Sequence, residues 1–189
     1  MRVISGAARG TVLFSPQGDK TRPTSDFVKE NLFNIIRADI IGARFLDLFA
    51  GTGAIGIEAL SRGAAFAVFV EVSPKCFSVI RRNLEKTRFV SHASIVKSDV
   101  VTAVKKLNGQ HFDLIFLDPP YLRDFTDKAL REIVEQDILS KDGYIILEMS
   151  KMDKPPQVTG LTIFREKEYS GTRLVFYEIH TEVNDEVII

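Results

Sequence analysis

The chain has 189 residues, 45% of them hydrophobic, and its 25 basic and 25 acidic side chains give a formal net charge of zero. A chain of this size can form one hydrophobic core with at most a small additional segment. A net charge of zero does not by itself indicate a nucleic-acid partner. The longest apolar runs are of strand length, so we expect no membrane-spanning helix. The N-terminus lacks the apolar run of a secretory signal, and we therefore expect a cytoplasmic protein.

The cysteine and histidine content argues against a metal site. Cys76 is the only cysteine, which excludes an intramolecular disulfide and a cysteine-built metal centre. The three histidines, His92, His111 and His180, lack the close spacing of helical zinc ligands. We expect no metal.

Residues 1–42 are predicted to form an N-terminal extension. A β-like segment from Val3 to Phe14 predicts a small hairpin, and a polar loop leads from it to a helix from about Ser25 to Ala38. Thr24 or Ser25 can cap that helix. Up to residue 22 there are four basic side chains and one acidic side chain. This distribution fits either a local basic patch that binds phosphates or a solvated surface that binds no partner.

From residue 43 to residue 189 short apolar runs alternate with longer helical ones, as in βαβ units with a parallel sheet. The predicted strands are Phe45 to Phe49, Phe66 to Val70, Ser94 to Lys97, Leu114 to Asp118 and Tyr144 to Glu148. The predicted helices are Ala54 to Arg62 and Pro74 to Lys86, the second capped by Ser73.

The end of the chain has a different pattern. Two strand-like runs, Leu161 to Glu168 and Arg173 to Ile179, flank Ser170-Gly171-Thr172 and predict a hairpin. We therefore predict an α/β fold with a doubly wound, mostly parallel, seven-stranded Rossmann-like sheet that the hairpin closes. The extension and this core are expected to form one compact domain.

A glycine-rich turn follows the first core strand. Gly51 and Gly53 allow close approach of a ligand to the backbone, and the next helix presents free N–H groups. Glu71 ends the following strand, where it can accept hydrogen bonds from ribose hydroxyls. With Gly56 the turn also satisfies the dinucleotide pattern, but Asp47 before it suits the ammonium of an amino acid better than a pyrophosphate. A turn without a ligand is the remaining alternative.

The second motif is Asp118-Pro119-Pro120-Tyr121, after the apolar run Phe112 to Leu117. In a doubly wound sheet it would share the crevice of the glycine turn. A base amino group is a poor nucleophile because its lone pair is delocalised. The Asp118 carboxylate and the Pro119 carbonyl can accept its hydrogens and so favour attack on a methylsulfonium, while Tyr121 offers a ring for an extruded base. The alternative interpretation is a turn at the end of the strand that has no catalytic function, in which Tyr121 only packs against its neighbours.

Together these segments resemble a known family. Asp47 to Gly53 is similar to motif I of class I methyltransferases, and Asp118 to Tyr121 to their amino-methylating motif IV. The whole chain resembles the RsmD family of ribosomal-RNA guanine-N2 methyltransferases, through Arg2-Val3-Ile4-Ser5-Gly6 with Arg9-Gly10, Arg22-Pro23-Thr24-Ser25-Asp26 with Glu30-Asn31-Leu32-Phe33-Asn34, and Gly56-Ile57-Glu58-Ala59-Leu60-Ser61-Arg62-Gly63-Ala64.

The resemblance implies methyl transfer from S-adenosylmethionine to the 2-amino group of a guanine in 16S RNA, in an assembled or partly assembled small subunit. It implies catalytic roles for Asp118, Pro119 and Tyr121. The implied cofactor residues are Asp47, Phe49, Ala50, Gly51, Thr52, Gly53, Glu71 for the ribose, Val72, Asp99 for the adenine, Val100 and Asp118. The implied substrate or RNA contacts are Arg9, Arg22, Thr24 and Tyr121. A Tyr-Gly turn near the active site would correspond to Tyr169-Ser170-Gly171-Thr172, although here Ser170 precedes the glycine.

Three other functions fit part of the sequence. A DNA adenine-N6 methyltransferase uses the same amino-group chemistry but usually carries a sizeable recognition domain. A nicotinamide oxidoreductase would not need the segment from Asp118 to Tyr121. An RNA-binding assembly factor that has kept the fold would not need an intact Asp118, Pro119 and Tyr121.

Overall fold

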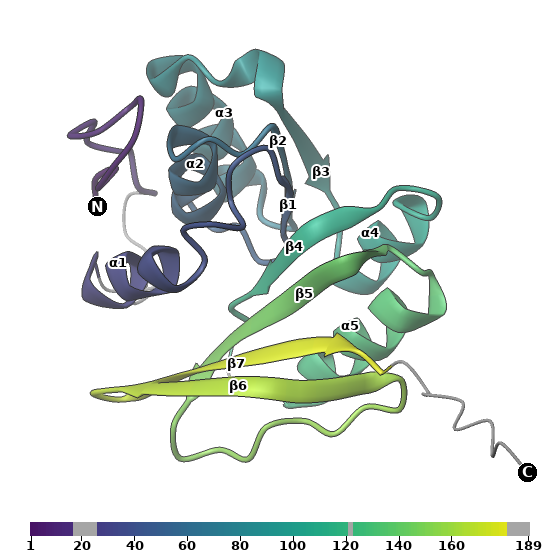
Figure 1. Ribbon diagram of the computed structural model, residues 1–189. Coiled ribbons are helices and arrows are strands. Elements are labelled where there is room, and N and C mark those ends of the chain that lie inside the picture. Colours follow the sequence, from purple (N-terminus) through teal and green to yellow (C-terminus); the bar gives the residue numbers. More distant parts are fainter. Residues whose placement is uncertain (17–25, 121–122, 181–189) are drawn as a thin grey trace, which may run out of the picture.

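The computed structural model describes residues 1–16, 26–120 and 123–180 (Figure 1). A single seven-stranded sheet has the order β3-β2-β1-β4-β5-β7-β6. Strands β1 to β5 pair in parallel, whereas β7 runs antiparallel to both of its neighbours. The strands are β1 (Arg44–Asp47), β2 (Phe66–Glu71), β3 (Ala93–Lys97), β4 (Phe112–Leu117), β5 (Leu139–Ser150), β6 (Leu161–Tyr169) and β7 (Thr172–Ile179). The predicted fold class is confirmed.

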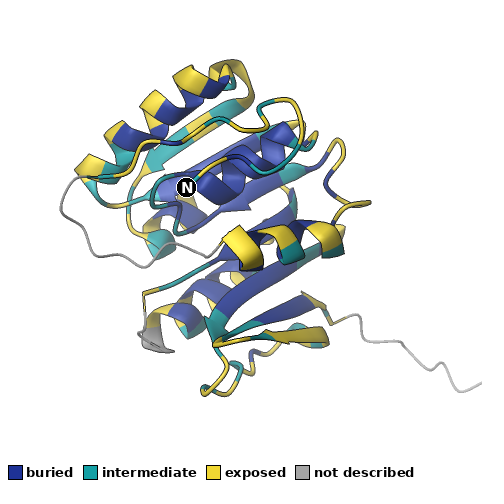
Figure 2. Ribbon diagram, turned by 90° about the vertical axis from the view of Figure 1, so that its left-hand side faces the viewer, coloured by how far each residue is buried: buried dark blue, intermediate teal, exposed yellow. Residues whose placement is uncertain are grey.

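Helices cover both faces of this sheet. They are α1 (Asp26–Ile35), α2 (Ala54–Ser61), α3 (Pro74–Thr87), α4 (Val100–Lys106) and α5 (Arg123–Glu135), with a short 3₁₀ turn, η1 (Val90–His92). Side chains alternate along β1, so Phe45 packs in the core with α1, α2 and α3, and Leu46 packs in the core with α4 and α5. Figure 2 shows the resulting buried layers of sheet and helix. None of the helices in the described residues is long and apolar enough to cross a membrane.

The predicted hairpin at the chain end is confirmed, since Tyr169 pairs with Thr172 across a two-residue turn. Ser73 caps α3 as predicted by accepting a hydrogen bond from the Cys76 N–H. The predicted cap at Thr24 or Ser25 lies outside the described residues.

Helices α4 and α5 and the first part of strand β5 were not predicted from the sequence. Helix α4 has only seven residues, too few to display a helical period, and Asp99 caps it. Strand β5 begins at Leu139 rather than Tyr144 because Leu139 pairs with Phe112 across a shift in register. The polar residues at 140–142 in between hide that pairing in the sequence.

The first 14 residues fold back on themselves. Arg2 and Val12 form one antiparallel bridge, and the Val3 N–H donates to the Thr11 carbonyl at 2.9 Å. The predicted hairpin is thus reduced to a tight loop whose ends are paired. Val3 and Leu13 are buried in the same hydrophobic cluster as residues of α1, α2 and β1, so this segment is part of the core on that face of the sheet.

A close backbone contact ties this loop to the end of α2. Gly6 has a positive φ of 84°, and a Cβ added there would lie 1.6 Å from the Ser61 carbonyl oxygen. The same carbonyl accepts a hydrogen bond from the Ala7 N–H at 2.7 Å. Glycine is therefore required at position 6 by its backbone angle and by the closeness of the helix.

Substituting this glycine should destabilise the protein more than substituting a nearby one. Gly10 has nearly the same φ, 83°, but no atom lies within 4 Å of an added Cβ. We expect Gly10→Ala to lower the free energy of unfolding by about 1 kcal/mol. Gly6→Ala should cost about 2 kcal/mol more because the Cβ overlaps backbone. Urea unfolding of both variants measures the difference, and equal losses would show that the contact with Ser61 does not matter.

Candidate active site

The glycine turn is built between three adjacent strands. After β1, the Leu48 N–H donates to the Phe116 carbonyl of β4, and the Ala50 N–H donates to the Val70 carbonyl of β2, each at 3.0 Å. Gly51 and Gly53 then have positive φ angles of 54° and 78°, and α2 begins at the next residue. An added Cβ on Gly51 would meet nothing within 4 Å, so the backbone here is open to close approach by a ligand.

Gly56, the third glycine of the pattern, has a packing role. An added Cβ would lie 2.3 Å from the Phe69 ring, so the glycine lets α2 lie close to β2. The other predicted residues of the turn are partly or fully enclosed: Phe49 and Thr52 are half-buried, and Ala50 is buried.

Asp47, at the end of β1, is a buried carboxylate with only 1% of its surface exposed. Burial raises its pKa to about 7, and the nearby carboxylates of Asp118 and Glu71 raise the pKa as well. Hydrogen bonds from the backbone N–H groups of Gly56 and Phe49 oppose this shift. Three acids from the ends of β1, β2 and β4 thus concentrate negative potential beside the glycine turn, a setting that favours a cationic ligand.

Glu71 links the glycine turn to the loop after β2. Its two carboxylate oxygens accept hydrogen bonds from the Gly51 N–H at 2.8 Å and the Ser73 N–H at 2.7 Å. Each oxygen can accept a further hydrogen bond, so hydroxyl groups of a ligand can still bind here. The neighbouring Val72 is 64% exposed and offers an apolar surface beside that carboxylate.

Asp99 and Val100 follow β3 at the same edge of the sheet. Asp99 is exposed, and its Oδ1 accepts a hydrogen bond from the Thr102 N–H at 3.0 Å, which caps α4 and lowers the pKa of the carboxyl. Capping alone accounts for an aspartate at this position. Its predicted role at an adenine ring stays a prediction.

The Asp-Pro-Pro segment follows β4 directly. Asp118 and Pro119 are half-buried and Pro120 is exposed. Because β1 and β4 pair in parallel, Asp118 lies at the same sheet edge as Asp47, close enough to raise the pKa of that carboxyl. The structure therefore brings together the two motifs that the sequence singled out. Tyr121, Arg22 and Thr24, also predicted as site residues, lie outside the described residues.

The turn between β6 and β7 reaches the same edge of the sheet. Thr172 pairs with Ser150, three residues beyond Leu147, which pairs with the last residue of β4. Tyr169 makes an edge-to-face contact with Phe27 of α1, with ring centroids 5.9 Å apart. An aromatic pair therefore joins the hairpin to α1 on this side of the molecule.

Arg9, a predicted RNA contact, lies in the N-terminal loop. It is exposed and lines a depression of about 280 Å³ with Arg2, Asp26 and Glu30 among its neighbours. Two acids therefore face the two arginines, and the predicted basic patch is partly neutralised at this point. Its role in RNA binding stays a prediction.

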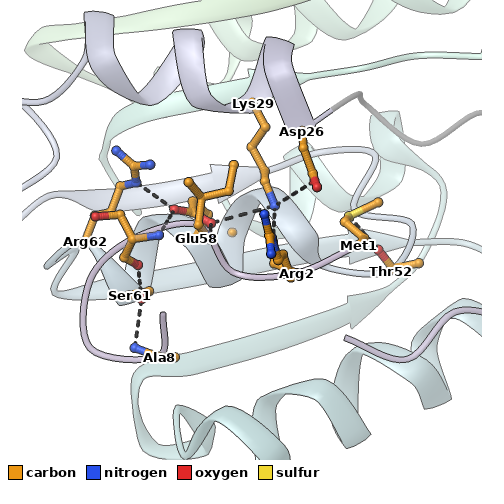
Figure 3. A network of polar contacts seen from close by, with 12 residues as sticks. Met1, Arg2, Ala8, Asp26, Lys29, Thr52, Glu58, Ser61 and Arg62 are labelled. Carbon is orange, nitrogen blue, oxygen red and sulfur yellow. Dashed lines mark hydrogen bonds and ion pairs between the residues drawn. The ribbon is translucent and has the colours of Figure 1, made fainter. Parts of the chain in front are cut away.

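A buried carboxylate that the sequence analysis did not single out fixes the N-terminal segment. Glu58 of α2 is fully buried and accepts hydrogen bonds from the Ile4 and Ser5 N–H groups at 2.7 and 2.9 Å. The Arg62 guanidinium binds it at 2.7 Å, and the Lys29 ammonium of α1 lies 3.7 Å away (Figure 3). The sequence did contain one sign of this role, because Glu58 is an acidic residue within the otherwise mostly apolar sequence of α2.

Lys29 and Asn83 extend this anchoring toward the glycine turn. The buried Lys29 ammonium donates to the Arg2 carbonyl at 2.6 Å. The Asn83 side chain of α3 accepts from the Phe14 N–H at 2.8 Å and donates to the carbonyls of Phe14 and Thr52 at 3.1 and 2.9 Å. The residues that flank the predicted Arg-Pro-Thr segment are thus held against α2, α3 and the glycine turn.

Removing the Glu58 charge should destabilise the fold strongly. Burial lowers the pKa of Lys29 while Glu58 and Asp26 oppose that shift, so Glu58→Gln leaves a buried ammonium without its closest counter-ion. Breaking a buried pair in this way typically costs about 3–5 kcal/mol. The exposed pair of Arg81 and Glu85 supplies a control, since Glu85→Gln should change the free energy of unfolding by less than about 0.5 kcal/mol. Urea unfolding that gives similar values for both variants would refute the anchoring role.

Comparison with known proteins adds to this geometry. The model of a family described as conserved hypothetical protein 95 matches residues 1–178. YlbH from Bacillus subtilis (strain 168), named as a candidate rRNA methyltransferase, is 39% identical over 183 residues, covering 94% of this chain and 98% of the relative. The ribosomal RNA small subunit methyltransferase D of Haemophilus influenzae is 34% identical, covering 95% and 93%.

Solved structures give the same picture. A methyltransferase candidate from Escherichia coli, yhhF, superposes with a TM-score of 0.86 at 28% identity and covers 96% of this chain and 99% of its own. An RNA methyltransferase from Salinibacter ruber in complex with S-adenosyl-L-homocysteine has a TM-score of 0.67 at 19% identity, with 87% and 98% covered, which is a likeness of fold alone.

Proposed function

The chain belongs to the RsmD family, whose model carries the description conserved hypothetical protein 95, and from that premise we propose that it methylates a guanine of small-subunit ribosomal RNA. The methyl donor is S-adenosylmethionine, and the acceptor is the exocyclic 2-amino group. One observation carries the proposal: Asp47, Glu71 and Asp118 converge beside an open glycine turn at the ends of three adjacent strands.

The substrate follows from the relatives. The Haemophilus protein, like its Escherichia coli counterpart at 32% identity, is named for methylation of small-subunit ribosomal RNA. We extend that substrate to this chain, and the RNA within an assembled or partly assembled subunit is our preferred form. The expected cytoplasmic location rests on this substrate.

The chain's own groups fit the donor. A carboxylate trio suits an α-ammonium and a sulfonium, and the open backbone of Gly51 suits close approach of the methionine part. The free acceptor capacity of Glu71 suits ribose hydroxyls, and the exposed Val72 suits a planar base. When bound, S-adenosylmethionine supplies an electrophilic methyl group.

Asp118 and Pro119 prepare the amino group for reaction. Both are half-buried at the end of β4, where a carboxylate and a carbonyl can accept hydrogen bonds from the two amino hydrogens. These bonds localise the nitrogen lone pair and align it. Transfer would form a nitrogen–methyl bond while the sulfur–methyl bond of the donor breaks and leaves S-adenosylhomocysteine. The amino proton that is released can be accepted by the Asp118 carboxylate, directly or through water.

The rival functions fit less well. A nicotinamide dinucleotide would bring a pyrophosphate toward three carboxylates, which is electrostatically unfavourable. A DNA adenine methyltransferase fits less well because relatives that match most of the chain are named for methylation of ribosomal RNA. A non-catalytic factor would not require Asp118 and Pro119 beside Asp47.

Loss of Asp118 should separate turnover from donor binding. With Asp118→Ala, methyl transfer to ribosomal RNA should fall by at least about 100-fold because the amino group loses its principal acceptor. The dissociation constant for S-adenosylmethionine should rise by no more than about threefold, since Asp118 raises the pKa of Asp47 and its removal favours the ionised Asp47. Calorimetry and transfer of a labelled methyl group measure the two quantities. Wild-type turnover in this variant would remove the catalytic role.

Donor affinity should depend on pH through Asp47. Its pKa is raised from 3.8 to about 7, so the carboxyl takes up a proton as the pH falls below about 7 and can no longer pair with an ammonium. Affinity for S-adenosylmethionine should rise from pH 5.5 to pH 7 and then level off, with a slope of up to about tenfold per pH unit. Calorimetry of wild type and Asp47→Asn tests this, because the variant should bind weakly and lose this dependence. A flat wild-type profile contradicts the assignment.

A further inference from the structure

A groove lies between the end of the N-terminal loop and helix α3. Its volume is about 640 Å³, and its described lining residues are Phe14, Ser15, Pro16, Pro74, Lys75, Ser78, Val79 and Arg82. Two of these residues are basic and none is acidic. The groove therefore has a local positive charge that the zero net charge of the whole chain conceals.

The cations are arranged along one face of α3. Lys75, Arg82 and Lys86 are separated by seven and four residues, or about 10 and 6 Å along the helix axis. The Arg82 guanidinium carbon lies 4.2 Å from the centroid of the Phe14 ring, and the Lys86 ammonium lies 4.5 Å from it. Lys86 also donates to the Val12 carbonyl at 2.6 Å. Stacking and hydrogen bonding thus hold the charges of Arg82 and Lys86 in place instead of leaving them on freely rotating side chains.

The wall of the groove is fixed to the candidate active site. Asn83 binds both backbone groups of Phe14 and also the Thr52 carbonyl in the glycine turn. Pro74, at the other end, begins α3 directly after the loop that Glu71 and Ser73 form. The groove therefore lies beside the proposed donor site and extends along α3.

We propose that this groove binds the sugar-phosphate backbone of the substrate RNA next to the target nucleotide. The inference rests on the proposed function and adds a docking surface to it. Fixed guanidinium and ammonium groups are the usual partners of phosphates, and the part of Phe14 that stays exposed, 37% of the residue, offers a ring for stacking. Because Arg82 and Lys86 are already ordered, fixing them on a phosphate costs little side-chain entropy.

Charge reversal at Arg82 tests the proposal. For Arg82→Glu, KM for ribosomal RNA should rise at least about tenfold, and Arg82→Gln should reduce the slope of log affinity against log salt by about 0.7, as for one lost phosphate contact. The kcat at saturating RNA and the dissociation constant for S-adenosylmethionine should stay within about threefold of wild type. Arg131→Glu, an exposed reversal on α5 at the opposite face of the sheet, should leave KM unchanged.

The outcomes separate this inference from the proposed function. If wild type transfers no methyl group to RNA, the proposed function fails. If wild type is active and Arg82→Glu keeps the wild-type KM and salt slope, only the groove is refuted. Weaker binding to assembled subunits with unchanged binding to naked RNA would point to a protein partner and would also overturn the inference. A thermal melt near that of wild type, together with recovery of KM in Arg82→Lys, shows that a rise in KM comes from lost charge and not from unfolding.

Discussion

Parallel pairing of β1 with both β2 and β4 places three strand ends side by side, and the candidate site depends on this alignment. Each strand delivers one carboxylate: Asp47, Glu71 and Asp118. Burial raises the pKa of Asp47, and repulsion by the neighbouring carboxylates of Asp118 and Glu71 raises it further. A protein that keeps such an unfavourable cluster gains from it only when a cation binds there, and a donor that carries both an ammonium and a sulfonium meets that condition.

A second constraint joins the N-terminal segment to this site. The buried Glu58 carboxylate holds residues 4 and 5, and Asn83 holds Phe14 and the glycine turn together. Both anchors use side chains to satisfy backbone groups that form no regular ladder in this segment. These anchors help to hold the loop in place, and a groove whose lining includes the cations of Lys75 and Arg82 forms where the loop meets α3.

The fold class, the chain-end hairpin and the convergence of the two motifs were predictable because they depend on local signals: alternating apolar runs, Gly51 and Gly53, and the Asp118-Pro119 break. Helix α4 was too short to show a period, and the first half of β5 was hidden by polar residues that only the pairing of Leu139 with Phe112 explains. The roles of Glu58 and Asn83 depend on contacts between residues more than 50 positions apart, which no local pattern encodes. Arg22, Thr24 and Tyr121 stay predictions.

The most direct test of this account is transfer of a labelled methyl group from S-adenosylmethionine to undermodified small ribosomal subunits, naked ribosomal RNA and duplex DNA side by side, with identification of the labelled nucleoside. The account predicts label in N2-methylguanosine from ribosomal RNA and none in DNA. Label in N6-methyladenine of DNA, or in none of the three substrates, would contradict it.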